Sequence, residues 1–430
     1  MSDRRVVVTG LGAVTPLGNT VPQSWKNLLA SRSGIGPISL FDASRFPTQI
    51  AGEVKDFSAS KWTAQNGRSR FMGRNSFFAL EAAEEAVQDA ALGEGGVKPE
   101  RYGIYFGAGD GGFNFAEYAE ILAGSVNGDG YSVDAGKYFK VSASKMTADS
   151  VVEQEPFQVV NHLSDHFGAQ GVVSNCLTAC AASSQAIGEA AELIRKGHAD
   201  VMISGGSHSM IHPLGVAGFN LLTALSTRND APAQASRPFD KNRDGFVLSE
   251  GAAVLVLEEW EHARKRGAKI YAEFAGYGGS ADAFRLTDPH PDGRGAIQAM
   301  RLCLSDARMN PEDIDYINAH GTSTELNDQI ETFAVKQVFG SQAYQIPMSS
   351  IKSMLGHMIA AAGAVELIAS ILTIRDGVIP PTINYETKDE ECDLDYVPNR
   401  AREQKVETVL SNSFGFGGQN ISLIVKKFNG

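Results

Sequence analysis

Residues 175–184 read Asn-Cys-Leu-Thr-Ala-Cys-Ala-Ala-Ser-Ser. The apolar run Gly171-Val172-Val173 before them predicts a buried strand, and the pattern from Ala181 to Lys196 predicts a long helix. Cys180 therefore stands where a strand turns into a helix. Unpaired backbone N–H groups and the positive end of the helix dipole favour the thiolate there, and the thiolate is the form that attacks carbonyl carbon. The alternative is that Cys180 is a small buried hydrophobic residue, as most free cysteines are.

The composition is that of a soluble globular protein, with 43% hydrophobic and 20% charged residues among 430. The net charge of −12 disfavours nucleic acid as a partner, because phosphate binding needs clustered positive charge. No apolar run approaches the roughly 18 residues of a membrane span, and the chain opens on a predicted strand. We therefore expect a cytoplasmic protein without membrane insertion. The four cysteines lack metal-ligand spacing, which argues against a zinc site and a disulfide framework.

The second half of the chain repeats the order of predicted helices and strands found in the first half. A helix over Gly295–Ala307 and a strand over Ile314–Asn318 repeat a helix over Leu80–Ala91 and a strand over Tyr102–Gly107. Strands that alternate with helices predict sheets covered on both faces. The sequence thus predicts an α/β fold of two fused copies, residues 1–262 and 263–430.

Two glycine-containing segments interrupt this pattern. The first strand, Arg4–Gly10, is predicted to end in the turn Gly10-Leu11-Gly12. Residues 110–158 are irregular and long for a connection, so we expect them to form a lid or cap inserted into the first half.

Three further polar stretches fall at predicted strand ends or turns. Residues 318–324 contain His320, residues 352–357 contain Lys352 and His357, and the glycine-rich turn 412–418 contains Phe416. Either histidine alone would more simply be a hydrogen-bonded structural residue. Their shared placement at strand ends, together with Cys180, predicts one catalytic cluster.

These stretches carry a resemblance that covers the chain from Arg4 to Lys427. It is similar to the β-ketoacyl-acyl carrier protein synthases of the elongating type, in particular synthase II of bacterial fatty acid synthesis. The resemblance implies a thiolase-like fold whose two pseudo-repeated halves form a layered α-β-α-β-α core. The motifs are Thr178-Ala179-Cys180-Ala181, Ala319-His320-Gly321-Thr322-Ser323-Thr324, Lys352-Ser353 with Gly356-His357, and Phe414-Gly415-Phe416-Gly417-Gly418.

The implied reaction is a decarboxylative Claisen condensation that yields 3-oxoacyl-acyl carrier protein. Cys180 would hold the acyl chain as a thioester, and His320 and His357 would donate hydrogen bonds to the enolate left when malonyl carrier protein loses CO₂. The backbone N–H groups of Cys180 and Phe416 would hold the oxyanion, and Phe416 would also act as a gate. Lys352, paired with Glu331, would orient His320. The remaining residues expected to support the site are Asp328, Thr322 and Asn412.

The resemblance also implies partners and a pocket. Acyl and malonyl acyl carrier proteins would dock on Arg68, Arg70, Arg74 and Arg228, for which a merely solvated basic face is the alternative. The substrates travel on carrier phosphopantetheine, so no metal or other cofactor is expected. The protein would be a homodimer. Asp110 and Phe219 would line the acyl pocket, and a carboxylate at position 110, where synthase II has an apolar residue, suggests an unusual acyl chain.

Rival functions require other residues. A non-decarboxylative thiolase needs a second cysteine in its C-terminal glycine loop, and residues 414–420 offer none. Synthase III pairs one histidine with asparagine, whereas this chain has His357. A non-catalytic, chain-length-setting partner of another ketosynthase lacks the nucleophile that Cys180 supplies.

Overall fold

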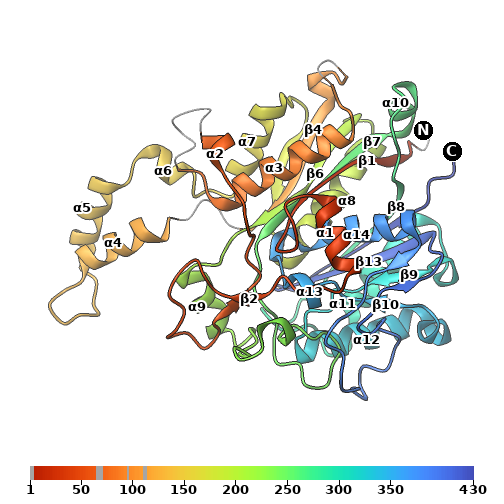
Figure 1. The fold of residues 1–430 in the computed structure, drawn as a ribbon. Helices are drawn as coiled ribbons and strands as arrows, with labels where there is room; N and C mark the ends of the chain where they lie inside the picture. Colours follow the sequence, from red (N-terminus) through yellow and green to blue (C-terminus); the bar gives the residue numbers. More distant parts are fainter. Residues whose placement is uncertain (1–3, 64–70, 94–95, 110–113) are drawn as a thin grey trace.

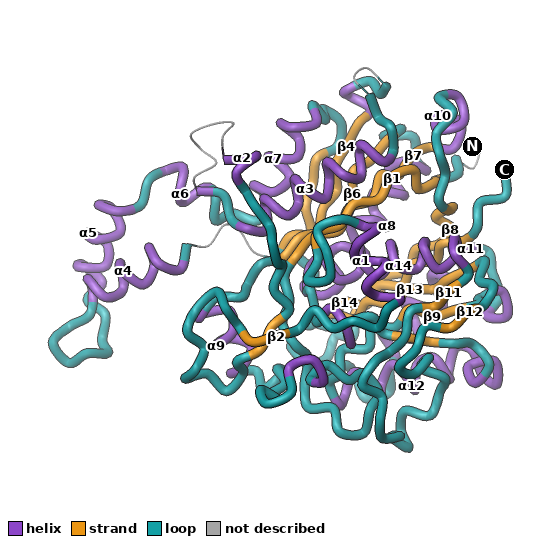
Figure 2. The backbone as a smooth tube through the Cα atoms, in the orientation of Figure 1, coloured by secondary structure: helices purple, strands orange, loops and turns teal. Residues whose placement is uncertain are grey.

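The computed structural model describes residues 4–63, 71–93, 96–109 and 114–430 (Figure 1). A single ten-stranded sheet runs through the body of the molecule, with helices packed on it (Figure 2). Two short pairs accompany it, β2 (Gly36–Pro37) with β3 (Ile50–Ala51) and β11 (Val378–Ile379) with β12 (Arg402–Glu403). The strand order is β10 (Met348–Ser349), β9 (Tyr316–Asn318), β13 (Thr408–Gly415), β14 (Gln419–Lys426), β8 (Ala272–Ala281), β1 (Val6–Val14), β7 (Gly251–Glu259), β6 (Val201–His208), β4 (Tyr102–Ala108) and β5 (Val173–Cys176).

The sheet consists of two halves with the same strand pattern. Outward from the centre, the first half runs β1, β7, β6, β4, β5, and the second runs β8, β14, β13, β9, β10. In each half the first two pairings are antiparallel and the last two are parallel. The halves meet where β1 pairs antiparallel with β8. This repeated order is the architecture expected of two fused α/β copies.

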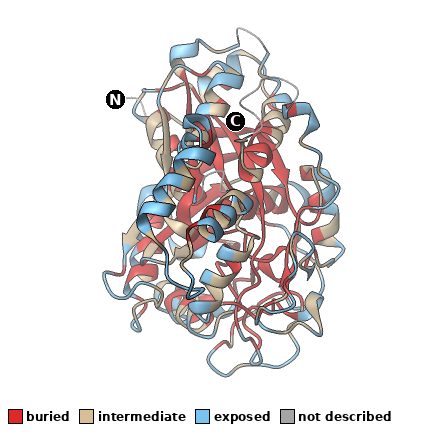
Figure 3. Cartoon of the chain, turned by 90° about the vertical axis from the view of Figure 1, so that its left-hand side faces the viewer, coloured by how far each residue is buried: buried red, intermediate tan, exposed pale blue. Residues whose placement is uncertain are grey.

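Helices form three layers around the two half-sheets. α3 (Arg74–Asp89) and α7 (Gln158–Phe167) cover the first half, while α11 (Arg294–Ala307), backed by α12 (Glu325–Phe339), covers the second. Between the half-sheets lie α8 (Ala182–Arg195) and α14 (Ala362–Asp376), which contact strands of both halves. The expected α-β-α-β-α layering is therefore present. Figure 3 shows the buried residues gathered on the sheet and the helices inside, with exposed residues on the outer helices.

Shorter helices complete the body. α1 (Val21–Leu29) packs on β1, and α10 (Trp260–Lys265) contacts β1 and β7. The others are α2 (Ser60–Thr63), α9 (Pro213–Leu221) and α13 (Lys352–Leu355).

The glycines at the start of the chain serve packing rather than a turn. β1 continues through Gly10 and Gly12 to Val14, so the predicted turn is wrong. A Cβ at Gly10 would lie 2.0 Å from the carbonyl oxygen of Ala86, and one at Gly12 would lie 1.9 Å from that of Ala82. Both carbonyls belong to α3. Glycine is needed here because α3 crosses β1 in backbone contact.

The segment after residue 113 is helical and projects from the body (Figure 1). It comprises α4 (Phe115–Ser125), α5 (Ala135–Lys145) and α6 (Ala148–Val152), and α4 packs against α5. The side chains of Asn114, Asp134 and Thr147 cap the three helix starts. The prediction of irregular structure was wrong for the described residues 114–158, which contain three helices. None of these described residues lines the catalytic cavity, and a role as lid or cap stays a prediction.

Candidate active site

Cys180 lies in a strained turn between β5 and α8. One 3₁₀ turn, Ala179–Ala181, precedes the helix, and Ala179 adopts a φ of +47°. A left-handed conformation at a non-glycine residue is costly and is often found at functional sites. The second half contains an equivalent turn, in which Ile359, with a φ of +41°, begins the 3₁₀ turn before α14. The two 3₁₀ turns contact each other. Alanine occupies position 360, the counterpart of Cys180, so of these two turns only the first carries a thiol.

The thiol of Cys180 is buried, with 4% of the residue exposed. Burial raises the pKa of Cys180 to about 11, although the backbone N–H groups of Phe416 and Cys180 and the charge of Lys352 act in the opposite direction. The backbone N–H groups thus favour the thiolate, as the sequence predicted for this turn, but burial outweighs them. The same two N–H groups still face the sulfur, where an oxyanion formed by attack on a thioester would need them.

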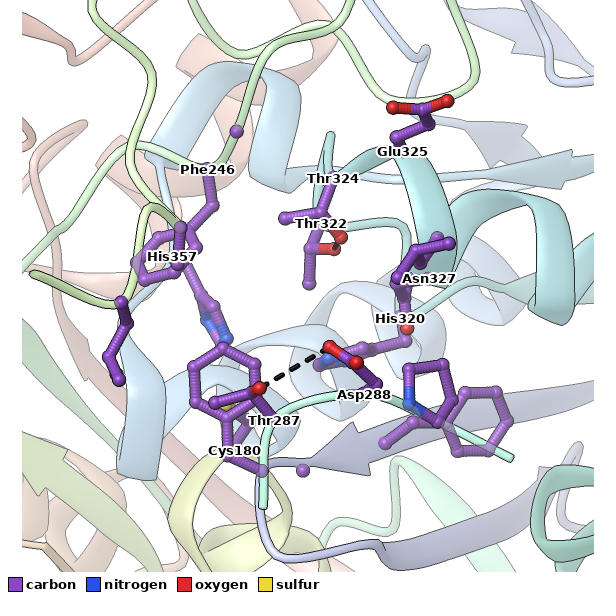
Figure 4. Close-up of a pocket in the computed structure, with 18 of the residues that line it drawn as sticks. Cys180, Phe246, Thr287, Asp288, His320, Thr322, Thr324, Glu325, Asn327 and His357 are labelled. Carbon is purple, nitrogen blue, oxygen red and sulfur yellow. Dashed lines mark hydrogen bonds between the residues drawn. The ribbon is translucent and has the colours of Figure 1, made fainter. Parts of the chain in front are cut away.

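Cys180, His320 and His357 lie at one end of a cavity of about 380 Å³ (Figure 4). The thiol sulfur and one ring nitrogen of each histidine all lie within 4.8 Å of one another. The two rings meet edge to face, with centroids 5.5 Å apart. Of the four cysteines, all within the described part of the chain, only Cys180 lines this cavity. The structure thus brings together the three side chains that the sequence predicted.

The protonation of His357 is set by a backbone contact. Its Nδ1 accepts a hydrogen bond of 3.2 Å from the N–H of Ile359, so the proton of the neutral ring resides on Nε2. Burial, followed by the charge of Lys352, holds the pKa of His357 well below its usual value. His357 is therefore a neutral ring with an Nε2–H, and Nε2 has no hydrogen-bond partner among the described residues.

His320 is held in the same tautomer by Lys352. The ammonium of Lys352 lies 3.3 Å from Nδ1 of His320 and donates to its carbonyl oxygen at 2.6 Å. An ammonium can only donate, so Nδ1 accepts and the ring proton lies on Nε2. Burial and the nearby positive charge of Lys352 hold the pKa of His320 well below its usual value.

The partner of Lys352 differs from the predicted one. Lys352 forms its ion pair with Glu366 of α14, and both side chains are almost fully buried. Sequence reasoning missed Glu366, although it is the single charged residue in the mostly apolar run 360–374, a signal that could have revealed it. Burial raises the pKa of Glu366 to about 7, against the charge of Lys352.

Glu331 supports the backbone of His320 instead. Its carboxylate accepts hydrogen bonds of 2.8 Å from the N–H groups of His320 and Gly321. Asn412 donates to the same carboxylate at 3.2 Å and accepts from Ser422 at 2.8 Å. Burial raises the pKa of Glu331 to about 7. Glu331 and Asn412 therefore position the loop that carries His320.

Asp328 and Thr322 occupy separate places around the histidine loop. Asp328 accepts the N–H of Phe239 at 2.8 Å and lies 3.6 Å from Arg243, so it anchors the loop before β7. Thr322 shares a hydrogen bond of 2.8 Å with Thr324, and both line the cavity. Thr322 can contact a substrate, whereas Asp328 is structural.

The glycine-rich turn between β13 and β14 presses against the nucleophile. A Cβ at Gly415 would lie 3.0 Å from the carbonyl oxygen of Thr178 and 3.3 Å from the nitrogen of Cys180. Phe416 lines the cavity and packs in the apolar cluster that contains Cys180. The lack of a side chain at Gly415 allows the N–H of Phe416 to reach the sulfur.

The cluster has residue types that bind metals, but its hydrogen bonds oppose a metal. A histidine that ligates through one nitrogen usually donates the other N–H to an acceptor. In His320 and His357 the outer nitrogens accept hydrogen bonds instead, which keeps the proton on the nitrogen that faces the cavity. The two rings are thus prepared to donate hydrogen bonds.

The cavity mouth contains residues that the sequence did not point to. Thr287 and Asp288 extend from the loop after β8, and the Thr287 hydroxyl donates to Asp288 at 3.3 Å (Figure 4). The loop that carries Thr287 and Asp288 has no pattern of its own in the sequence, so only the tertiary fold reveals these two residues. Phe246, from a stretch that matches the family, packs edge to face against His357, with centroids 5.2 Å apart.

The remaining predicted residues lie outside the catalytic cluster. Phe219 packs on Phe246 in the apolar cluster that includes Cys180, as a residue near an acyl pocket would. The guanidinium of Arg74 binds the buried carboxylate of Glu250, which neutralises its charge within the fold. Arg228 donates to the carbonyl oxygen of Asn242 at 3.2 Å. Arg68, Arg70 and Asp110 lie outside the described residues.

Comparisons with known proteins place this architecture in one family. The Beta-ketoacyl synthase, N-terminal domain family model matches residues 3–263, and the Beta-ketoacyl synthase, C-terminal domain model matches residues 271–386. The chain is 45% identical over 432 residues to 3-oxoacyl-[acyl-carrier-protein] synthase 2 of Synechocystis sp., covering 100% of this chain and 99% of the relative. It is 46% identical over 429 residues to the protein of that name from Coxiella burnetii, covering 99% of each.

Solved structures agree with the sequence relatives. A β-ketoacyl synthase from Burkholderia phymatum superposes with a TM-score of 0.89 at 36% identity, over 99% of this chain and 100% of that one. A chain of a type II PKS acyl-carrier protein complex with its ketosynthase bound to the hexaketide superposes at 0.88 with 35% identity, over 100% of both chains. With its thiolase-like fold of two repeated halves, this chain belongs to the β-ketoacyl synthase family.

Proposed function

We propose that this protein condenses an acyl chain held on Cys180 with malonyl-acyl carrier protein, releasing CO₂ and forming 3-oxoacyl-acyl carrier protein. One observation carries the proposal: a thiol and two neutral imidazoles, each with an Nε2–H, converge within 4.8 Å at the end of one cavity. The printed names of the relatives, 3-oxoacyl-[acyl-carrier-protein] synthase 2, support the same reaction.

In the first step the Cys180 sulfur attacks the thioester carbonyl of the acyl carrier protein. A C–S bond forms to Cys180, the bond to the phosphopantetheine sulfur breaks, and the proton of Cys180 leaves with the carrier thiol. The N–H groups of Cys180 and Phe416 face this point and would hold the tetrahedral oxyanion. In comparable sites, loss of one such donor costs about 2.7–4 kcal/mol of transition-state stabilisation.

In the second step malonyl carrier protein loses CO₂. Negative charge then develops on its thioester oxygen, and the Nε2–H groups of His320 and His357 are placed to donate to that oxygen. The enolate carbon attacks the acyl-Cys180 carbonyl, a C–C bond forms, and the Cys180 thiolate leaves. One proton taken up by this thiolate completes the balance: acyl-enzyme, malonyl carrier and H⁺ give 3-oxoacyl carrier, CO₂ and free thiol.

Lys352 and Glu366 act on this step without touching the substrate. Lys352 holds Nδ1 of His320 as an acceptor, and Glu366 balances the buried ammonium. Glu331 fixes the backbone of the same loop. These residues set the direction and tautomer of the His320 donor, so we assign them positioning roles.

The remaining expectations complete the proposal. The protein acts in the cytoplasm on carrier-bound substrates, without a metal or other cofactor. It works as a homodimer: the arm formed by α4 and α5 exposes Tyr131 (86%) and Phe139 (75%), which a second copy would cover. No helix within the described ranges is both long and apolar enough to cross a membrane.

The test combines purified protein, acyl carrier proteins of graded chain length and malonyl carrier protein. We expect CO₂ and a 3-oxoacyl product for at least one chain length. Cys180→Ala should abolish acyl transfer, whereas His320→Ala and His357→Ala should still be acylated but lose decarboxylation. Absence of product from wild type across all chain lengths, or retention of product by all three variants, would refute the assignment.

A further inference from the structure

Helix α9 presents an apolar face that the fold leaves open. Its inner face is buried through Val216, which packs with Phe219 in the cluster around Cys180. Its outer face carries Leu214, 48% exposed, and Leu221, 85% exposed. These leucines are seven residues apart and therefore share one side of the helix. Figure 1 shows α9 at the periphery of the molecule.

A notch separates the two leucines. Gly218 lies four residues after Leu214 and three before Leu221, on the same side of the helix. A Cβ built at Gly218 would meet no atom within 4 Å, so nothing in the described part of the chain fills the space above it. A helix that crosses here could insert one side chain over the glycine and between the leucines, as ridges fit into grooves.

The apolar face continues directly into the mouth of the catalytic cavity. Leu222, 44% exposed, follows the last residue of α9, and Leu222, Thr223 and Ala224 all line the cavity that ends at Cys180. In the proposed reaction the phosphopantetheine group enters through this mouth, while the carrier protein to which it is attached stays outside. The carrier must therefore rest on the surface that borders the mouth.

Among the described residues, charge offers little attraction on the α9 side of this border. Residues 201–227 contain no Asp, Glu, Lys or Arg. The exposed charged residues of the cavity rim include the acids Asp244 and Glu325. Arg243 also lines the cavity, but it is buried and paired with Asp389 at 2.6 Å. The surface bordering the mouth on the α9 side is thus apolar and uncharged.

We propose that the stripe Leu214–Gly218–Leu221 of α9, continued by Leu222, is the seat of a carrier-protein helix, which binds there through an apolar side chain rather than through charge. The proposal rests on the proposed function, because it takes the occupant of the mouth to be a carrier of acyl-phosphopantetheine. It makes α9 a determinant of which carrier protein the enzyme accepts.

The test compares two acyl donors that carry the octanoyl chain on the same pantetheine group. Octanoyl-acyl carrier protein of the source organism presents a protein surface, whereas octanoyl-pantetheine enters the same cavity without one. Acylation of Cys180 is followed by mass spectrometry for wild type and two variants. Leu221→Ser removes one leucine of the stripe, and Gly218→Leu fills the notch between the leucines. Leu302→Ser on α11, 44% exposed, is the matched control far from the mouth.

We expect Leu221→Ser and Gly218→Leu to raise the KM for the carrier substrate roughly tenfold, with acylation by octanoyl-pantetheine within about twofold of wild type. Raising NaCl from about 50 to 500 mM should change the wild-type KM by less than about threefold. Leu302→Ser should leave both substrates unaffected.

Four outcomes would overturn the inference. The first two are a KM for the carrier substrate that neither variant changes, and equal decreases in Cys180 acylation with both donors. The third is a wild-type KM for the carrier substrate that rises steeply with salt. The fourth is a change in oligomeric mass, which would assign the face to a second copy. If acyl carrier proteins of every chain length tested failed to acylate Cys180 in wild type, the proposed function itself would fail, so the two failures are distinguishable.

Discussion

The backbone N–H of Ile359 donates to Nδ1 of His357 across 3.2 Å, and this bond fixes the ring proton on Nε2. Ile359 reaches this position through a left-handed φ of +41°. The fold thus accepts local backbone strain and gains a hydrogen-bond donor at the place where enolate charge would develop.

We predict that His320 and His357 are neutral Nε2–H tautomers at pH 6. Both pKa values are lowered by burial, so neither ring takes up a second proton near its usual value of about 6.5. Nitrogen-15 NMR of histidine-labelled protein reports protonation and tautomer directly. Assignment by comparison with His320→Asn and His357→Asn should give an unprotonated Nδ1 in each ring, and a doubly protonated ring at pH 6 would refute the prediction.

The same shifts predict how stability depends on pH. A buried neutral histidine binds fewer protons than its unfolded counterpart, so the free energy of unfolding falls as the pH drops below the unfolded value near 6.5. Each of the two histidines should contribute a slope of about 1.4 kcal/mol per pH unit below that point. Urea unfolding of wild type and His357→Asn between pH 5 and 7 measures the difference. Exposed His198→Asn is the control, and equal slopes in wild type and His357→Asn would contradict the account.

The buried pair Lys352–Glu366 should be strongly coupled. Replacing either residue alone by Met leaves its partner buried without a counter-charge, which costs about 3 kcal/mol of stability. The double variant should lose at least about 1 kcal/mol less than the sum of the single losses. The exposed pair Lys405–Glu407, 2.8 Å apart, is the control and should show almost no coupling. Simple additivity at Lys352 and Glu366 would remove the basis for their joint positioning role.

Gly415→Ala should impair acyl transfer more than folding. The new Cβ would press on the carbonyl of Thr178 and the nitrogen of Cys180, moving the Phe416 N–H away from the sulfur. We expect the acylation rate to fall roughly 100-fold, as when one oxyanion donor is lost, with a small change in Tm. Gly36→Ala, where a Cβ meets no atom within 4 Å, should behave like wild type. A normal acylation rate in Gly415→Ala would argue against the turn as part of the oxyanion site.

Local patterns predicted much of this fold and site. The strand before Cys180, His320 after the strand β9 and the repeated halves follow from periodicity and turn residues, and they reappear in the structure. The prediction of a buried strand was wrong, because β5 is half-buried and Val172 beside it is exposed. His357 follows the helix α13 rather than a strand. The Glu366 partner of Lys352 could not be predicted in this way, because the two meet only when α14 packs behind the histidine loop. The pKa of Cys180 depends on burial, which the sequence of a turn does not report.

Two segments misled the sequence reading for identifiable reasons. Gly10 and Gly12 suggested a turn, yet they are glycine because α3 lies in backbone contact with β1. In residues 114–158 the glycines suggested irregular structure, but the caps Asn114 and Asp134 and the contact between α4 and α5 stabilise helices. At Gly10 and Gly12 the deciding contact joins residues distant in sequence, whereas the caps Asn114 and Asp134 are local signals that the sequence reading missed.

The central claim is that Cys180 carries the acyl chain and passes it to an enolate generated beside it. Mass spectrometry of the enzyme after incubation with acyl carrier protein tests it most directly, with malonyl carrier protein then added and CO₂ collected. We predict one acyl group, on the peptide containing Cys180, discharged on malonyl addition with one CO₂ released per acyl group. An acyl group on another residue, or one that remains on Cys180 while CO₂ is released, would contradict the account.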